Sequence, residues 1–246
     1  MRFESPDVSV VVPCRNERDN IGPLIGEIAE ALLGRRHEIL VVDDGSDDGT
    51  DEAVRTASKR HPQVRLIRHD RSAGQSAAVR TGVEAARGAV VLTIDGDGQN
   101  DPAFLPALLG ALEAGGGATG LAAGQRVGRK ATFAKRHGSR VANSVRRALL
   151  KDSTRDTGCG LKAVRRDLFL RLPYFDGWHR FLPALVIREG YGIATVDVVD
   201  RPRRHGKSNY GIFDRLWVGI ADLFGVWWLM KRRRVRPVQT EVPLDD

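Results

Sequence analysis

The sequence predicts an α/β protein with a mostly parallel sheet and helices on its faces. Short apolar, β-branched runs alternate with segments of helical periodicity, and several of these runs end in acidic or polar clusters. Strands that alternate with helices at short intervals form βαβ units. Ligands bind such sheets beyond the carboxyl ends of the strands, so we expect the polar clusters to converge on one crevice.

The first half of the chain shows this alternation most clearly. Its apolar runs suit strands buried on both faces, which we place at 8–12, 38–42, 64–67 and 89–94. Helical spacing predicts helices at 21–32, from Thr50, at 76–86 and at 104–112, with Gly34 as the C-cap of the first.

The pattern is looser after Gly115–Gly117. We expect strands at 121–124, 161–164 and 193–198, a basic helix at 133–150, a helix at 181–188 and a polar loop at 201–210. The arginine pair Arg146–Arg147 should lie on a solvated face.

The composition indicates a folded globular protein, but it does not indicate a particular function. The 246 residues allow one substantial domain with an appendage, and a hydrophobic share of 41% is typical of a folded protein. The net charge of +8 favours acidic partners such as nucleic acid, anionic lipid or phosphorylated substrates. Cys14 and Cys159 lack metal-type spacing, so free thiols in a reducing cytosol are expected. No signal peptide is apparent at the N-terminus.

Asp95 and Asp97 flank a glycine at the end of a predicted buried strand, and Gln99 follows two residues later. Alternate residues of an extended segment point the same way, so the three side chains could face one point. Such oxygen ligands suit Mg²⁺ or Mn²⁺ bound between carboxylates and substrate phosphates. The alternative is a solvated acidic turn.

Asp43 and Asp44 follow the second predicted strand. Acidic residues at strand ends bind ribose or base edges in other nucleotide-binding sheets. The alternative is helix capping, to which Ser46 and Thr50 are also suited. Both interpretations are compatible.

Three motifs together resemble the GT-A glycosyltransferases of family 2. They are Val-Val-Val-Pro-Cys-Arg-Asn-Glu (10–17), Val-Val-Asp-Asp-Gly-Ser-Asp-Asp-Gly-Thr (41–50) and Ile-Asp-Gly-Asp-Gly-Gln-Asn-Asp-Pro (94–102). Two further segments, 156–162 and 205–211, resemble the polyprenyl-phosphate branch, which includes dolichol-phosphate mannose synthase-like enzymes. Gly98 departs from the leucine common in the dolichol enzymes.

The resemblance implies a GT-A Rossmann-like catalytic domain over 1–210 and a role for each matching residue. Residues that would border the donor nucleotide are Pro13, Arg15, Glu17, Asp43, Asp44, Gly74, Gln75 and Asp95. The metal would be held by Asp95, Asp97 and Gln99. Residues that would bind the acceptor phosphate or the donor diphosphate are Arg126, Arg140, Lys207 and Ser208. Cationic side chains can offset repulsion between two phosphate-bearing substrates.

Asp97 and Asp156 are the candidate catalytic residues. A sugar or protein hydroxyl would need a general base, whereas a phosphate monoester is already anionic near pH 7 and needs mainly positioning. Helix capping is the alternative for Asp156. The family implies inversion at the anomeric carbon.

Residues 211–230 form an amphipathic, aromatic-rich stretch with Asp214, Arg215 and Asp222 on one side, followed by a basic run at 231–236. Aromatic and cationic residues favour an anionic membrane interface, so we expect 211–236 to attach peripherally to the inner face of the cell membrane. A helix packed on the core or on another copy in a homo-oligomer is the alternative. A spanning helix is disfavoured by the charges. Residues 237–246 are expected to be a disordered tail.

We therefore expect inverting transfer of a sugar from a nucleotide-diphosphate sugar to an undecaprenyl or dolichyl phosphate at the cytoplasmic membrane surface. The alternative is a family 2 glycosyltransferase acting on a saccharide or protein hydroxyl. Nucleic acid is not an expected partner, because no helix-turn-helix, zinc or RNA-binding signature is found.

Overall fold

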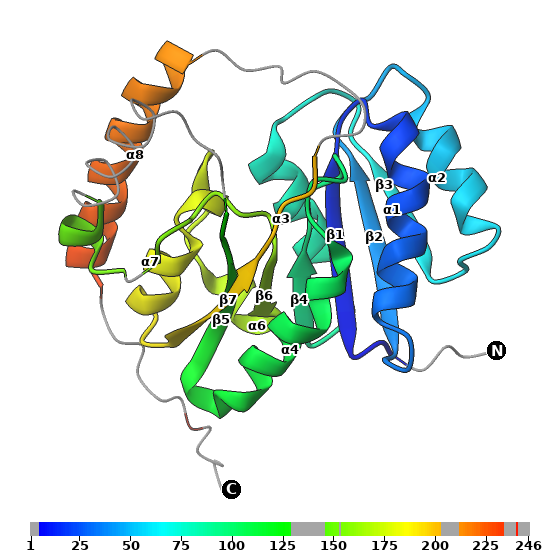
Figure 1. The fold of residues 1–246 in the computed structure, drawn as a ribbon. Helices are drawn as coiled ribbons and strands as arrows, with labels where there is room; N and C mark the ends of the chain where they lie inside the picture. Colours follow the sequence, from blue (N-terminus) through cyan, green and yellow to red (C-terminus); the bar gives the residue numbers. More distant parts are fainter. Residues whose placement is uncertain (1–4, 129–145, 153, 203–211, 234–239, 241–246) are drawn as a thin grey trace, which may run out of the picture.

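The structure, a computed structural model, describes residues 5–128, 146–152, 154–202, 212–233 and 240. Its centre is a seven-stranded sheet in the order β3-β2-β1-β4-β6-β5-β7, with helices on both faces (Figure 1). The strands are β1 Val8–Cys14, β2 His37–Asp43, β3 Val64–Arg68, β4 Val90–Thr93, β5 Thr119–Arg126, β6 Lys162–Arg165 and β7 Gly192–Val198. The α/β fold with a mostly parallel sheet is as the sequence predicts.

One strand breaks the parallel pattern. The pairs β1–β2, β2–β3, β1–β4 and β5–β7 are parallel, whereas β6 runs antiparallel to both β4 and β5. Lys162, the first residue of β6, therefore pairs with Thr93, the last residue of β4. This reversal brings the segment before β6 to the same edge as the carboxyl ends of the parallel strands.

Helices connect the strands largely where the periodicity places them. They are α1 Arg18–Ala31, α2 Thr50–Ser58, α3 Gln75–Ala85, α4 Leu105–Ala114, α6 Arg166–Arg171, α7 Leu182–Arg188 and α8 Ile212–Lys231, with short η1 Pro102–Phe104, η2 Gly116–Ala118 and η3 Trp178–Arg180. The six-residue α6 was not anticipated, because so short a helix shows little periodicity. Residues 146–150 are also helical.

Two expectations about local structure are wrong. The C-cap of α1 is Leu32, and Gly34 adopts its positive φ of 86° two residues further on. Arg146 is buried rather than solvated, because it forms an ion pair with Asp152 at 3.2 Å and donates to the carbonyl of Thr154. Arg147 is exposed, as expected.

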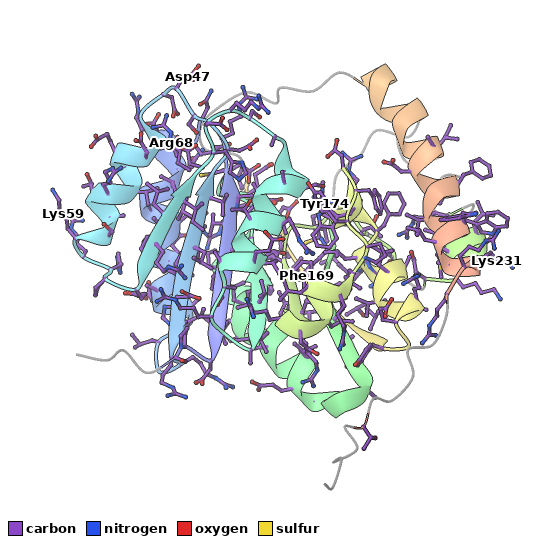
Figure 2. The ribbon with its side chains drawn as sticks, turned by 180° about the vertical axis from the view of Figure 1, so that it is seen from behind. Asp47, Lys59, Arg68, Phe169, Tyr174 and Lys231 are labelled. Carbon is purple, nitrogen blue, oxygen red and sulfur yellow. The ribbon has the colours of Figure 1, made fainter. Side chains whose placement is uncertain are left out.

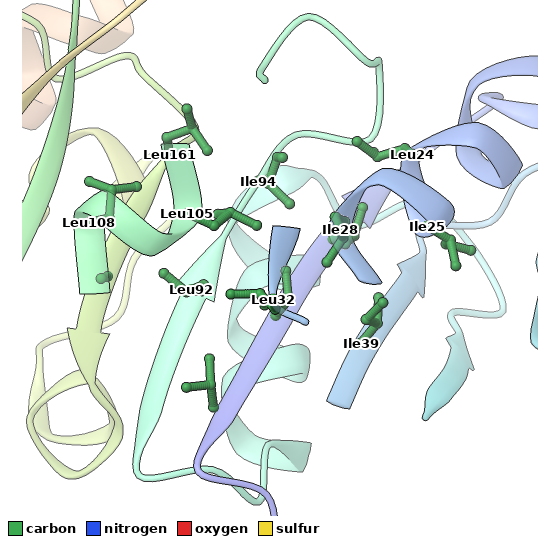
Figure 3. Close-up of a cluster of buried hydrophobic side chains, with 14 of the residues drawn as sticks. Leu24, Ile25, Ile28, Leu32, Ile39, Leu92, Ile94, Leu105, Leu108 and Leu161 are labelled. Atoms are coloured by element: carbon green, nitrogen blue, oxygen red, sulfur yellow. The ribbon is translucent and has the colours of Figure 1, made fainter. Parts of the chain in front are cut away.

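The core lies on both faces of the sheet. Along β1, Val10 and Val12 face one hydrophobic cluster and Val11 faces the other, as strand alternation requires. Figure 3 shows the first cluster, in which α1, α4 and β4 contribute side chains such as Ile28, Leu105 and Leu92. These layers hold the strand ends in place.

Helix α8 packs against α7 at the end of the molecule away from α1 and α2 (Figure 1). Val226 is fully buried, and Leu223, Leu229 and Met230 contact the same cluster. Within the part of the chain that the structure describes, none of the helices has the length and apolar character needed to span a bilayer.

We predict that Leu92→Ala will lower the free energy of unfolding by about 2–5 kcal/mol, because it leaves a cavity in the cluster of Figure 3. Leu33→Ala is the matched control, since Leu33 is 86% exposed, and it should change stability by less than about 0.5 kcal/mol. Equal effects in urea unfolding would contradict this packing.

Candidate active site

The carboxyl ends of β1, β2 and β4 meet at one edge of the sheet. Asp44 N donates to the carbonyl of Cys14 at 2.9 Å, and Gly96 N donates to the carbonyl of Pro13 at 3.2 Å. The backbone after β1 is thereby bonded to the segments that follow both of its neighbours. The three polar clusters of the sequence lie side by side, as the fold class predicts.

The loop after β1 is fastened to the loop after β2. Glu17 N donates to Thr50 Oγ1 at 2.9 Å, and the Glu17 carboxylate accepts from Asn20 Nδ2 at 2.6 Å. Arg15 is exposed in the same loop. Glu17 therefore helps to hold the start of α1, and a contact with a nucleotide stays a prediction for both residues.

Asp43 and Asp44 are both buried, and their environments differ. The Asp44 carboxylate accepts four hydrogen bonds, from His69 Nδ1, Ser72 Oγ and the backbone N–H groups of Ala73 and Gly74, at 2.7–2.9 Å. These bonds lower the pKa of Asp44 despite the opposing effect of burial, which is the largest single influence. Asp44 thus organises the loop that leads into α3.

Asp43 has an incompletely satisfied carboxylate. Oδ1 accepts from Ser46 N at 2.9 Å, whereas Oδ2 has no hydrogen-bond partner and lies 3.5 Å from Arg68 Nε. This contact lies in the loop before α2, whose N-cap is Gly49 with no side-chain hydrogen bond, so Asp43 and Ser46 do not cap the helix. The side chain is fully buried, so the predicted contact with ribose or base would require local rearrangement.

Asp95 and Asp97 follow β4 directly. Asp95 Oδ1 accepts from Gln75 Nε2 at 2.8 Å, which joins the first residue of α3 to the acidic motif. Gln99 N donates to Asp97 Oδ1 at 3.1 Å, so the turn is closed by its own backbone. Gly160 packs so tightly against Asp95 that a Cβ there would lie 2.5 Å from Asp95 Oδ2.

Burial and the neighbouring Asp97 raise the pKa of Asp95 to about 6, although Lys162 and Arg126 act in the opposite direction. Two carboxylates that repel one another near a strand end fit a divalent cation, which would relieve the repulsion. Within the described residues there is no cluster of three or more His, Cys, Asp or Glu side chains that could hold a metal. Mg²⁺ typically binds one or two carboxylates plus substrate phosphates, so the pair suffices.

Arg126 and Asp156, predicted separately, are partners. Arg126 Nε and Nη2 donate to the two carboxylate oxygens of Asp156 at 2.5 and 2.9 Å, and Nη1 lies 3.4 Å from Asp200 Oδ2. The acids raise the pKa of Arg126 even though burial alone would lower it. A guanidinium has five N–H groups, so a phosphate could still bind this fork.

Asn100 and Asp200 are two site residues that were not predicted from the sequence. Asn100 Nδ2 donates to Asp200 Oδ1 at 3.2 Å, and Arg201 N donates to the carbonyl of Gln99 at 2.7 Å. The end of β7 is therefore bonded to the acidic motif. Such contacts join residues about 100 positions apart and leave no local signal in the sequence.

Lys162 and His179 were also not predicted as site residues. Both line a cavity beside Asp95, together with Pro13 and Gln75. Burial lowers the pKa of Lys162, and burial with nearby Lys162 and Arg180 lowers the pKa of His179 to about 3. A charged residue in the apolar run 161–164 was the available signal for Lys162.

Arg140, Lys207 and Ser208 lie outside the described residues, so the roles expected for them stay predictions. Arg201, near the end of the described segment 154–202, forms ion pairs with Glu27 and Asp101 at 2.5 and 2.6 Å.

Solved structures of similar shape belong to a glycosyltransferase. Glucosyl-3-phosphoglycerate synthase from Mycobacterium tuberculosis, in complex with UDP, superposes with a TM-score of 0.69 at 24% identity, covering 92% of this chain and 80% of that one. The same enzyme with Mn²⁺, UDP-glucose and glycerol 3-phosphate gives 0.64 at 22% identity, covering 94% and 82%. At this identity the likeness shows the GT-A-like fold alone.

The sequence itself decides the family. The profile of Glycosyl transferase family 2 matches residues 9–172, and the chain belongs to this family. Dodecaprenyl-phosphate galacturonate synthase from Rhizobium johnstonii is 34% identical over 95% of this chain and 70% of its own length. Undecaprenyl-phosphate 4-deoxy-4-formamido-L-arabinose transferase from Edwardsiella ictaluri is 31% identical over 83% and 63%. The protein is therefore a glycosyltransferase whose relatives include polyprenyl-phosphate sugar transferases.

The raised pKa of Asp95 predicts a pH-dependent stability in the metal-free protein. The folded state retains a proton up to about pH 6, whereas the unfolded state releases it near 3.8, so stability falls as pH rises between these values. Relative to Asp95→Asn, wild type should lose about 1–3 kcal/mol between pH 4 and pH 7.

Urea unfolding at the two pH values measures this difference. Asp167→Asn, whose side chain is 69% exposed on α6, is the control and should track wild type. If the stability of Asp95→Asn and that of wild type changed in parallel with pH, the inference that burial and Asp97 raise the pKa of Asp95 would be wrong.

Proposed function

We propose that this glycosyltransferase moves a sugar from a nucleotide-diphosphate sugar to a polyprenyl phosphate at a membrane surface, with inversion at the anomeric carbon. The observation that carries the donor half is the strand-end motif of Asp95 and Asp97, bonded to Gln75. The polyprenyl-phosphate transferases among its relatives support the acceptor half. The chain spans 63–70% of the length of these two relatives, so we attribute their activity to this chain only as a proposal.

On the donor side, the backbone segments after β1, β2 and β4 form the surface on which a nucleotide would lie. Pro13, Arg15 and Glu17 would border this surface, and Gly74 is the N-cap of α3, whose first residue is Gln75. Asp95 and Asp97, with Gln99, are proposed to hold Mg²⁺ or Mn²⁺, which would neutralise charge on the leaving diphosphate. The fold neighbour that was crystallised with Mn²⁺ and UDP-glucose is consistent with this choice.

On the acceptor side, the proposal places the lipid phosphate near Arg126. Its guanidinium is held rigidly by Asp156 and Asp200, which fixes the direction of its remaining N–H groups. A phosphate oxygen is anionic near pH 7 and can attack without a base. Asp156 would then act as a positioning residue for Arg126. Arg140, Lys207 and Ser208 would complete the phosphate contacts.

The orientation of α8 supports membrane attachment. The side with Asp222 and Val226 is turned toward the domain, while Phe224, Trp227 and Trp228 are 58%, 36% and 54% exposed. Lys231 lies 5.9 Å from the centre of the Trp227 ring, and Arg232 lies near Trp228 in the same way. In Figure 2, Lys231 marks this end, opposite to Lys59. An outward aromatic face with adjacent cations suits an anionic lipid interface.

We predict that Asp97→Ala will reduce sugar transfer by at least about 100-fold, because stabilisation of the leaving diphosphate is lost. The assay follows radiolabelled sugar from a panel of UDP- and GDP-sugars into the organic extract, with polyprenyl phosphate and Mn²⁺. Asp167→Ala, which removes an exposed side chain of α6, should retain wild-type activity. Normal turnover by Asp97→Ala would refute the metal assignment, and label appearing in aqueous oligosaccharide would favour a hydroxyl acceptor.

We predict that the double variant Phe224→Ser/Trp228→Ser will bind vesicles of phosphatidylglycerol and phosphatidylethanolamine at least about 10-fold more weakly. Both side chains are exposed, so the loss reflects contact with lipid rather than unfolding. Leu33→Ser serves as the control, because it removes an exposed apolar side chain from the turn that follows α1. Unchanged sedimentation with vesicles would show that this face does not meet the membrane.

A further inference from the structure

A cavity of about 210 Å³ opens beside Asp95, between the end of β4, the start of β6 and the residues of η3. At about 30 Å³ per water it would hold about seven waters, and it is smaller than the roughly 300–1,000 Å³ of a complete small-molecule site. Its size suits one part of a nucleotide sugar. Because it adjoins the proposed diphosphate site, the part it suits is the sugar ring.

Lys162 is the first cation on its wall. The side chain is only 4% exposed, and its ammonium donates to the carbonyl of Cys159. An ammonium has three N–H groups, and among the described residues this carbonyl is the acceptor it has, so two remain for the cavity. Asp95 and Asp156 act on this ammonium electrostatically, but its hydrogen bond in the described structure is to a carbonyl, and a buried charge is costly unless an anion reaches it.

His179 adds an uncharged imidazole. Gly177 N donates to Ser76 Oγ at 2.9 Å, and Ser76 Oγ lies 2.7 Å from His179 Nδ1. The contact with Ser76 occupies Nδ1 and leaves Nε2 as the ring nitrogen that can meet a ligand. The imidazole therefore adds a polar group to the cavity without adding negative charge.

Arg180 is the second cation. It is half-buried and lines the cavity next to His179. Burial raises the pKa of Asp222 on α8, and Arg180 acts in the opposite direction, so the two groups lie within electrostatic range. Asp176 also acts on Asp222, but neither acid is among the residues that line the cavity.

The only carboxylate among the residues that line the cavity in the described structure is Asp95, which the proposed function assigns to the metal. The charged groups left to face the sugar are then the two cations, Lys162 and Arg180, and the uncharged His179 ring also lines the cavity. We propose that the sugar transferred carries a carboxylate, so that the donor is a nucleoside-diphosphate hexuronic acid, recognised by Lys162 and Arg180. This inference rests on the proposed function, because it takes the diphosphate to lie at Asp95 and Asp97.

The test compares donors that differ only at the carboxylate. UDP-galacturonate is paired with UDP-galactose, UDP-glucuronate with UDP-glucose, and GDP-mannuronate with GDP-mannose, each with polyprenyl phosphate and Mn²⁺. In at least one pair, kcat/KM for the uronate should exceed that for the neutral sugar by about 10-fold or more. Lys162→Met and Arg180→Gln should each reduce this ratio by about 10-fold.

Lys59→Met, which removes an exposed lysine at the far end of the molecule in Figure 2, should leave the ratio unchanged. The affinity for UDP or GDP alone should change by less than about 2-fold in all three variants. A loss of nucleoside-diphosphate affinity, with equal damage to both donors of a pair, would overturn the inference, because the cations would then bind the diphosphate.

Wild-type preference for a neutral hexose would also overturn the inference, and would leave transfer to the lipid phosphate intact. Absence of lipid product from every donor would instead contradict the proposed function. In that case equilibrium binding of the intact nucleotide sugars still decides the carboxylate preference, because it requires no acceptor.

Discussion

The site depends on how the protein tolerates two carboxylates at the end of β4. Asp95 and Asp97 repel each other in a place where burial already disfavours charge, and both effects raise the pKa of Asp95. The protein compensates with Gln75, which donates to Asp95, and with the positive charge of Lys162 and Arg126 nearby. Gly160 permits this arrangement, because any side chain there would collide with the Asp95 carboxylate.

The reversal of β6 explains how one edge of the sheet would serve the two proposed substrates. The parallel strands β1, β2 and β4 bring the proposed donor-binding clusters together, whereas β6 starts where β4 ends and carries Lys162 to the same edge. Arg126, at the end of β5, and Asp156, in the segment before β6, meet there as an ion pair. The proposed acceptor side thus lies in the mixed half of the sheet, next to the proposed donor side.

Much of this could be predicted from the sequence, where the signal is local. Apolar runs gave the strands to within a few residues, and the acids at 95 and 97 stood out because they follow such a run directly. Lys162, His179 and Asp200 were missed because their importance comes from long-range pairing. The pairing of Arg126 with Asp156, the burial of Arg146 and the direction of β6 were likewise set by tertiary contacts.

The most direct test of the proposed metal site is anomalous diffraction from crystals grown with Mn²⁺ and UDP or GDP. We predict one Mn²⁺ peak at about 2.0–2.3 Å from a carboxylate oxygen of Asp95 or Asp97 and from the diphosphate. A manganese ion and nucleotide bound elsewhere, with both carboxylates remote from them, would contradict it.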